Sequence, residues 1–184
     1  MREASGILAE CTLAYVRLEE ANALGEREFV ERFGGVFEHS PWVARRAWRN
    51  KPFRSFDALH ASMMQAISEA QEEEQLALVR AHPELAGKEA KQGTLTVDSS
   101  SEQARLGFTR LTHEEFTRMG LLNKRYRERH GFPCIVALRL HASRSSVVKE
   151  IELRAANDSG AELKYALEQI GHITRGRLEK IVDG

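Results

Sequence analysis

The 184-residue chain is long enough to bury about two-thirds of its unfolded surface in a single core, so we expect one domain over residues 1–184. It is 42% hydrophobic, and Lys plus Arg equals Asp plus Glu at 27 each, which argues against a nucleic-acid partner. No apolar run could span a membrane, no signal core follows Met1, and Cys11 and Cys134 suggest no disulfide framework, so we expect a cytoplasmic protein without a membrane partner.

Apolar residues at helical spacing predict a succession of amphipathic helices in the first half of the chain. These helices should start near residues 7, 26, 41, 56 and 72. Ser40 and Ser55 suit N-cap positions, and Pro41 suits a first helical turn. Pro83 disfavours helical geometry in the residue before it, so the last of these helices should end near His82.

The sequence of the second half of the chain predicts a loop, followed by a helix from about residue 100 to residue 107. Thr112 and Glu115 form a capping box for the next helix, which should end at Gly131. Ser145 or Ser146 should cap a further helix, and the last should follow residues 157–160.

Residues 132–140 (Phe-Pro-Cys-Ile-Val-Ala-Leu-Arg-Leu) are the only stretch that looks like a strand. A lone strand leaves backbone N–H groups unpaired, so this segment needs partners elsewhere. The sequence therefore predicts an all-α fold, namely a single compact multi-helix domain with one short extended segment near 132–140.

Residues 80–103 are the candidate site, because this polar loop lies between two helices and carries acid–base groups. His82 follows a helix end, where the negative pole of the helix would favour a protonated ring and so a proton donor near neutral pH. The alternative is a histidine that only caps free carbonyl groups.

Glu102 and Arg177 each have a functional and a structural interpretation. Ser99 and Glu102 fit a capping box, in which the glutamate binds only the Ser99 amide. Alternatively, this helix start binds an anionic or carbonyl-bearing ligand, and the serines and Gln103 add hydrogen bonds. Arg177 lies on the face of the last helix and either reaches the site or extends its head group to solvent.

Motifs for zinc, nucleotide and serine-hydrolase chemistry are absent: the sequence has no His-Glu-x-x-His, Cys-x-x-Cys, phosphate loop or Gly-x-Ser-x-Gly. His82 and Glu84 could both contact one metal ion, but two ligands do not make a site. We therefore expect no metal site.

Four stretches, in this order and spacing, resemble the 2-oxo-4-hydroxy-4-carboxy-5-ureidoimidazoline (OHCU) decarboxylases of urate breakdown. They are residues 33–42 (Phe-Gly-Gly-Val-Phe-Glu-His-Ser-Pro-Trp), 82–88 (His-Pro-Glu-Leu-Ala-Gly-Lys), 99–103 (Ser-Ser-Ser-Glu-Gln) and 123–135 (Asn-Lys-Arg-Tyr-Arg-Glu-Arg-His-Gly-Phe-Pro-Cys-Ile). The resemblance runs from about residue 18 to the C-terminus and leaves residues 1–17 outside it. It implies an all-helical, cofactor-free carboxy-lyase, usually a homodimer, that forms (S)-allantoin and CO2.

The resemblance also implies a set of site residues. His82 matches the family's proton donor, Glu102 pairs with the substrate hydroxyl or with His82, and Arg177 (or Arg175, if the alignment has a gap) holds the heterocycle. The other residues expected to bind substrate are Pro83, Ser99, Ser100, Ser101, Gln103, Ile135, Val136, Ala137, Leu138 and Arg139. Residues such as Phe37 or Trp42 are expected to roof a closed pocket.

Two other functions remain open from the sequence. One is a non-catalytic helical protein that binds a ureide or a purine-like ligand in the same pocket. The other is a hydrolase or lyase that acts on a related ureide, with His82 as general base.

Overall fold

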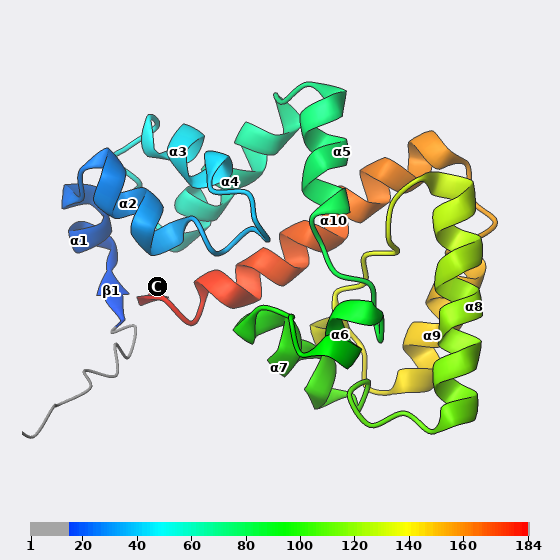
Figure 1. Ribbon diagram of the computed structural model, residues 1–184. Helices are drawn as coiled ribbons and strands as arrows, with labels where there is room; N and C mark the ends of the chain where they lie inside the picture. The colour runs from blue at the N-terminus through cyan, green and yellow to red at the C-terminus, as the bar shows by residue number, and fades with distance from the viewer. Residues whose placement is uncertain (1–14, 184) are drawn as a thin grey trace, which may run out of the picture.

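The computed structural model describes residues 15–183 and is built almost entirely of helices (Figure 1). The helices are α1 Leu18–Ala23, α2 Glu26–Phe33, α3 Trp42–Trp48, α4 Phe56–Ser68, α5 Glu72–Arg80, α6 Lys88–Gln92, α7 Val97–Arg105, α8 His113–His130, the 3-10 helix η1 Leu138–Leu140, α9 Arg144–Arg154 and α10 Ser159–Leu178. Two short strands, β1 Val16–Arg17 and β2 Val182–Asp183, pair in parallel. The predicted all-α fold is confirmed.

Helix α10 is the central element of the molecule. It packs against α4, α5, α8 and η1, and in Figure 1 it crosses between the N-terminal helices and the α8–α9 pair. Ala166, Ile170 and Leu178 on α10 are fully buried, because they form one apolar face along the helix. The end of α10 therefore lies within reach of elements from both halves of the chain.

Several predicted helix ends are confirmed. Ser55 accepts a hydrogen bond from the amide of Ala58 (3.1 Å) and caps α4. Thr112 and Glu115 form the expected capping box at α8. Gly131 ends α8 in the left-handed conformation (φ 78°), where a side chain would be strained.

Other helix starts differ from the prediction. Helix α7 begins at Val97 and its cap is Thr96, whose hydroxyl accepts from the Ser99 amide (3.3 Å), so the helix predicted near residue 100 starts earlier. Ser143, not Ser145 or Ser146, caps α9. Pro41 precedes α3 in helical geometry, and Ser40 is buried without a side-chain cap. Short helix α6 lies within the predicted loop.

The segment predicted as a strand pairs with no other strand among residues 15–183. It is irregular up to Ala137 and then turns into η1. Side chains from flanking helices bind its backbone instead, which answers the demand for hydrogen-bond partners.

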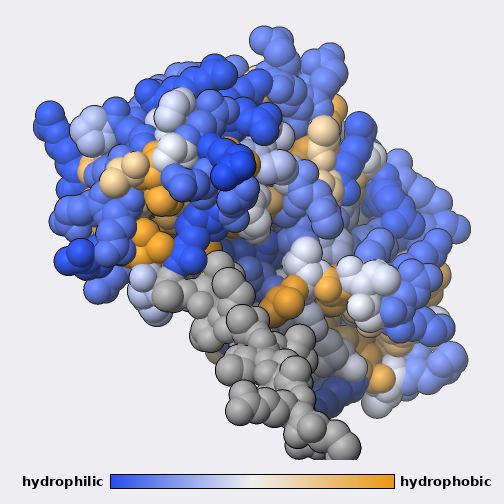
Figure 2. Space-filling view, turned by 60° about the vertical axis from the view of Figure 1, so that its left-hand side comes forward, coloured by the Kyte–Doolittle hydropathy of each residue, from blue (hydrophilic) through white to orange (hydrophobic). Residues whose placement is uncertain are grey.

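The predicted first helix lies mostly in residues 1–14, outside the described part of the chain, and residues 16–17 form β1 rather than a helix. The face in Figure 2 is largely hydrophilic, with separate hydrophobic patches. Within residues 15–183, none of the helices combines the length and apolar character needed to cross a bilayer.

Candidate active site

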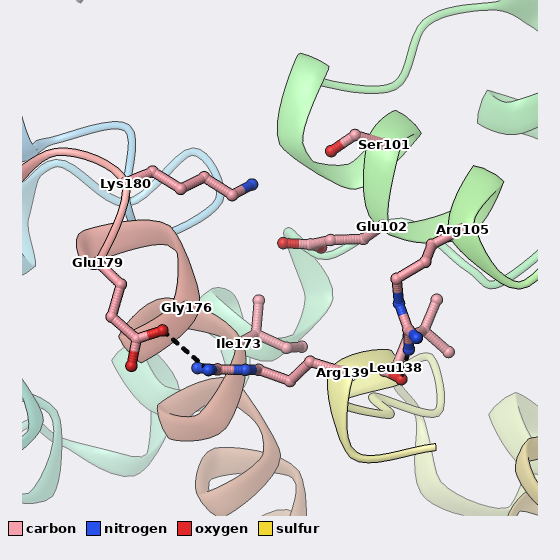
Figure 3. A pocket seen from close by; sticks show the side chains of 9 residues that line it. All are labelled: Ser101, Glu102, Arg105, Leu138, Arg139, Ile173, Gly176, Glu179 and Lys180. Carbon is pink, nitrogen blue, oxygen red and sulfur yellow. Dashed lines mark hydrogen bonds and ion pairs between the residues drawn. The ribbon is translucent and has the colours of Figure 1, made fainter. Parts of the chain in front are cut away.

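Two adjoining hollows lie where α7, α10 and the segment after α8 meet. The inner cavity has a volume of about 50 Å³ and is lined by His82, Pro83, Leu85, Ser99, Glu102, Gln103, Cys134, Ile135, Val136, Leu138, Ile173 and Arg177. The outer pocket, about 220 Å³, shares Glu102, Leu138 and Ile173 with it (Figure 3). A heterocycle with several substituents needs more space than the inner cavity provides, so a ligand must extend into the outer pocket.

His82 is buried at the wall of the inner cavity, just beyond the end of α5. Its Nδ1 lies 2.9 Å from the carbonyl oxygen of Leu78, which requires Nδ1 to carry the proton. Its Nε2 is buried and has no hydrogen-bond partner among residues 15–183. The ring thus caps a carbonyl, as one interpretation predicted, while its second nitrogen stays available to a ligand.

The expected protonated state of His82 is wrong. Burial lowers its pKa to about 4, and it outweighs both the hydrogen bond to Leu78 and the charge of Glu38, which raise the pKa. Arg177 lowers it further. At neutral pH the ring is neutral and Nε2 carries a lone pair, so the free protein presents a hydrogen-bond acceptor here.

Arg177 reaches the site from the end of α10 and is almost fully buried, with its side chain 2% exposed. Its Nη1 donates to Glu38 Oε2 (2.7 Å), while Nε and Nη2 donate to the two oxygens of Glu102 (2.9 Å each). Burial alone would lower the pKa of Arg177, but these two carboxylates raise it above its ordinary value. The guanidinium is thus compensated by two anions and fixed in direction.

Glu102 binds neither the Ser99 amide nor His82. Its carboxylate is engaged in the bidentate pair with Arg177, and the Ser99 amide binds Thr96 instead, so the capping-box interpretation is wrong. His82 and Glu102 nevertheless line the same cavity, as the proposed chemistry requires. Arg175 instead pairs with Asp57 (2.8 Å).

The loop after His82 is held by polar side chains from two helices. Gln103 on α7 accepts from the Ala86 amide (3.0 Å) and donates to the Glu84 carbonyl (3.4 Å). Asn123 on α8 donates to the Leu85 carbonyl (2.8 Å). Gln103 therefore lines the cavity but uses its amide to fix the loop.

The wall formed by residues 132–138 is fixed in the same way. Arg154 donates to the carbonyl of Ile135 (2.5 Å), and Arg105 donates to that of Leu138. Gln169 accepts from the Ala137 amide (2.9 Å), so this N–H group is already bound. Each helix around the segment thus provides one partner for it.

The structure brings most of the predicted residues together, but not all of them. The residues at the inner cavity are His82, Pro83, Ser99, Glu102, Gln103, Ile135, Val136, Leu138 and Arg177. Ser101 and Arg139 lie at the outer pocket, where Arg139 pairs with Glu179 (2.8 Å; Figure 3). Ser100 is exposed and lines neither hollow, and neither does Ala137.

The expected aromatic roof is wrong. Phe37 belongs to the hydrophobic core with 1% of its surface exposed, and Trp42 lies under the guanidinium of Arg46 (4.5 Å). Neither residue lines the cavity. Leu85 and Ile173, which do line it, were not singled out from the sequence.

The role of Glu38 was not predicted from the sequence, although the residue lies in one of the four stretches that carry the family resemblance. This side chain is 1% exposed and accepts hydrogen bonds from Thr96 (2.7 Å), Ser99 (3.1 Å) and Arg177. Burial would raise its pKa, but the bond and charge of Arg177 lower it below the ordinary value. A carboxylate directly after the apolar pair Val36 and Phe37 was the available signal.

Cys134 lines the cavity, but burial raises the pKa of its thiol to about 12, so it is not a thiolate nucleophile at neutral pH. Within residues 15–183, no group of three or more His, Cys, Asp or Glu side chains is placed to hold a metal ion.

Known proteins match this chain in sequence over most of its length. The OHCU decarboxylase family model matches residues 22–179. The 2-oxo-4-hydroxy-4-carboxy-5-ureidoimidazoline decarboxylase of Amia calva is 35% identical over 165 residues, which cover 90% of this chain and 94% of that protein. A uric acid degradation bifunctional protein from Bacillus sp. (strain TB-90) is 37% identical over 166 residues, but the chain spans only 32% of its length.

The fold is also similar to the crystal structure of an (S)-allantoin synthase, with a TM-score of 0.71 and 27% sequence identity. The match covers 90% of this chain and 54% of that one. The chain belongs to the OHCU decarboxylase family.

Proposed function

We propose that the chain decarboxylates OHCU, in urate breakdown, to (S)-allantoin and CO2, which makes it a carboxy-lyase. The observation that carries the proposal is the convergence of an imidazole acceptor, a buried guanidinium and a carboxylate on one cavity in a member of this family. The inner cavity has the donors and acceptors that a small anionic heterocycle requires.

OHCU carries its carboxylate on a ring carbon next to a C=N bond. When the bond to CO2 breaks, its electron pair forms a ring C=C bond and the imine nitrogen takes up a proton from solvent. The hydroxyl proton of this enol must then leave as the carbonyl forms, and the ureido-bearing carbon must gain a proton. Because the substrate itself accepts the electrons, we propose that the reaction needs no cofactor.

His82 enters this sequence as a base, because its Nε2 carries a lone pair in the free protein. It accepts the enol hydroxyl proton, becomes an imidazolium and returns a proton to the ring carbon from one face. The bond from Nδ1 to Leu78 keeps the ring oriented through both transfers. Delivery from a single fixed nitrogen to one face of the ring would give one enantiomer of allantoin in excess.

Arg177 and Glu102 bind the substrate around that nitrogen. The carboxylate of the substrate would pair with the guanidinium of Arg177. Glu102 would accept a hydrogen bond from the hydroxyl or the ring N–H groups of the substrate. Hydrophobic contacts from Pro83 and Ile135 would exclude water from the reacting carbon.

We further propose one domain over residues 1–184, a homodimer and a cytoplasmic location.

The test is to supply freshly prepared OHCU and measure both CO2 release and the optical activity of the allantoin. We expect release faster than in buffer and an excess of one enantiomer, whereas spontaneous decay gives a racemate. His82→Asn is the matched control, since its amide can keep the bond to Leu78 but lacks the second nitrogen. A racemic product formed at the rate seen in buffer would mean that the protein only binds a ligand. A product formed without release of CO2 would indicate a hydrolase.

A further inference from the structure

We propose that Glu38 is a positioning residue, which holds Arg177 and Ser99 permanently so that Glu102 can give up Arg177 to the anionic substrate. This inference rests on the proposed function. It assigns different roles to the two carboxylates that Arg177 binds: Glu38 is the fixed partner and Glu102 is the exchangeable one.

The two carboxylates that bind Arg177 differ in how deeply they are buried. The Glu38 side chain is 1% exposed, whereas that of Glu102 is 28% exposed at the junction between the hollows. The oxygens of Glu38 bind Thr96 and Ser99 as well as Arg177, so each has a hydrogen-bond donor. If this carboxylate left, it would leave the Thr96 and Ser99 hydroxyl groups and Nη1 of Arg177 without their acceptor inside the protein.

Ser99 shows how Glu38 sets direction as well as charge. Its hydroxyl donates to Glu38 Oε2 and accepts from Arg177 Nη2, both at 3.1 Å. Since the hydroxyl has one proton, the bond to Glu38 leaves its lone pairs for the guanidinium. Glu38 thereby ties the start of α7 to the end of α10, on opposite sides of the cavity.

The charges around Arg177 explain why an exchangeable partner is needed. With His82 neutral, one cation meets two carboxylates, so an incoming substrate carboxylate is repelled unless one of them withdraws. Figure 3 shows Glu102 projecting into the outer pocket between Arg105 and Lys180. Lys180 already pairs with Asp98 (2.9 Å), and Nη2 of Arg105 binds the Leu138 and His141 carbonyl groups. Arg105 lies one helix turn along α7 from Glu102, so we propose that its remaining N–H groups receive Glu102 after it leaves Arg177.

Glu38→Gln tests the proposal, because it keeps the shape of the side chain and removes its charge. The first readout is hydrogen exchange of the Arg177 Nη1–H groups, which donate to Glu38, measured by nitrogen-15 NMR and assigned by the loss of their signal in Arg177→Gln. We expect exchange at least ten-fold faster in Glu38→Gln. The Nε–H group of Arg154, which binds buried Glu162 (2.7 Å), is the internal control and should not change.

The second readout is kinetic, and Ser55→Ala, which removes the cap of α4, controls for lost stability alone. With OHCU we expect Glu38→Gln to raise KM at least ten-fold, Glu38→Asp to restore part of this change, and Ser55→Ala to leave KM unaltered. If Glu38→Gln does not fold, Glu38→Asp carries the exchange test, with at least three-fold faster exchange at Arg177 alone.

The proposed role of Glu38 is overturned if hydrogen exchange at Arg177 is unchanged in the folded variants. It is also overturned if exchange accelerates equally at Arg177 and Arg154. A wild-type protein that does not turn over OHCU would instead refute the proposed function, and the exchange arm would still test the hold of Glu38 on Arg177.

Discussion

Because His82 is buried and neutral, we expect the free energy of unfolding to fall in mild acid. Replacing His82 should remove this part of the pH dependence. The folded protein holds this pKa at about 4, against 6.5 for the free side chain. Between these values the unfolded chain binds a proton that the folded protein excludes. The contribution is therefore complete above about pH 6.5 and is lost as the pH falls toward 4.

The size of this effect follows from the pKa difference. Each pKa unit corresponds to about 1.4 kcal/mol, so the whole difference is worth about 3 kcal/mol, of which about 2 kcal/mol is lost at pH 5. His82→Asn removes the titrating ring while its amide can still donate to Leu78. We expect the wild type to lose about 2 kcal/mol more than the variant between pH 7.5 and pH 5.

Urea unfolding of both proteins at the two pH values measures this difference. His60 and His130 titrate in both proteins, so their effects cancel in the comparison. Parallel losses of stability would refute the argument that burial keeps His82 neutral. In the same samples, His82→Asn should cut turnover of OHCU by roughly two to four orders of magnitude.

Three further predictions concern the side chains around the site. Glu102→Gln should lower the melting temperature only slightly, because Glu38 still compensates the charge of Arg177 and Thr96 caps α7, but should lower kcat at least ten-fold; full activity would exclude Glu102 from the chemistry. Thr96→Val should cost about 1–3 kcal/mol in urea unfolding, because the hydroxyl both caps α7 and donates to the buried Glu38 carboxylate; an unchanged stability would contradict both roles. Arg154→Met should cost about 3–5 kcal/mol because it strands buried Glu162, and the double variant with Glu162→Gln should recover part of that loss.

Local sequence patterns correctly predicted a helix end where the capping residues lie next to each other in the chain. Ser55, the Thr112–Glu115 capping box and Gly131 act within one helical turn, so their roles can be predicted without the fold. The starts of α7 and α9 were misplaced because several hydroxyl residues stand side by side there. Which of them caps a helix depends on where its neighbours are needed; Ser99, for example, binds Glu38 and Arg177.

The sequence by itself determined the helical class, the family resemblance and the set of polar residues from which the site is made. The tertiary structure decided what those residues do. Burial reversed the expected charge of His82, because desolvation outweighs the field of a helix end. The approach of α10 to α7 and to the loop before α3 joined Glu38, Glu102 and Arg177, which lie far apart in the chain and which no local spacing could have paired.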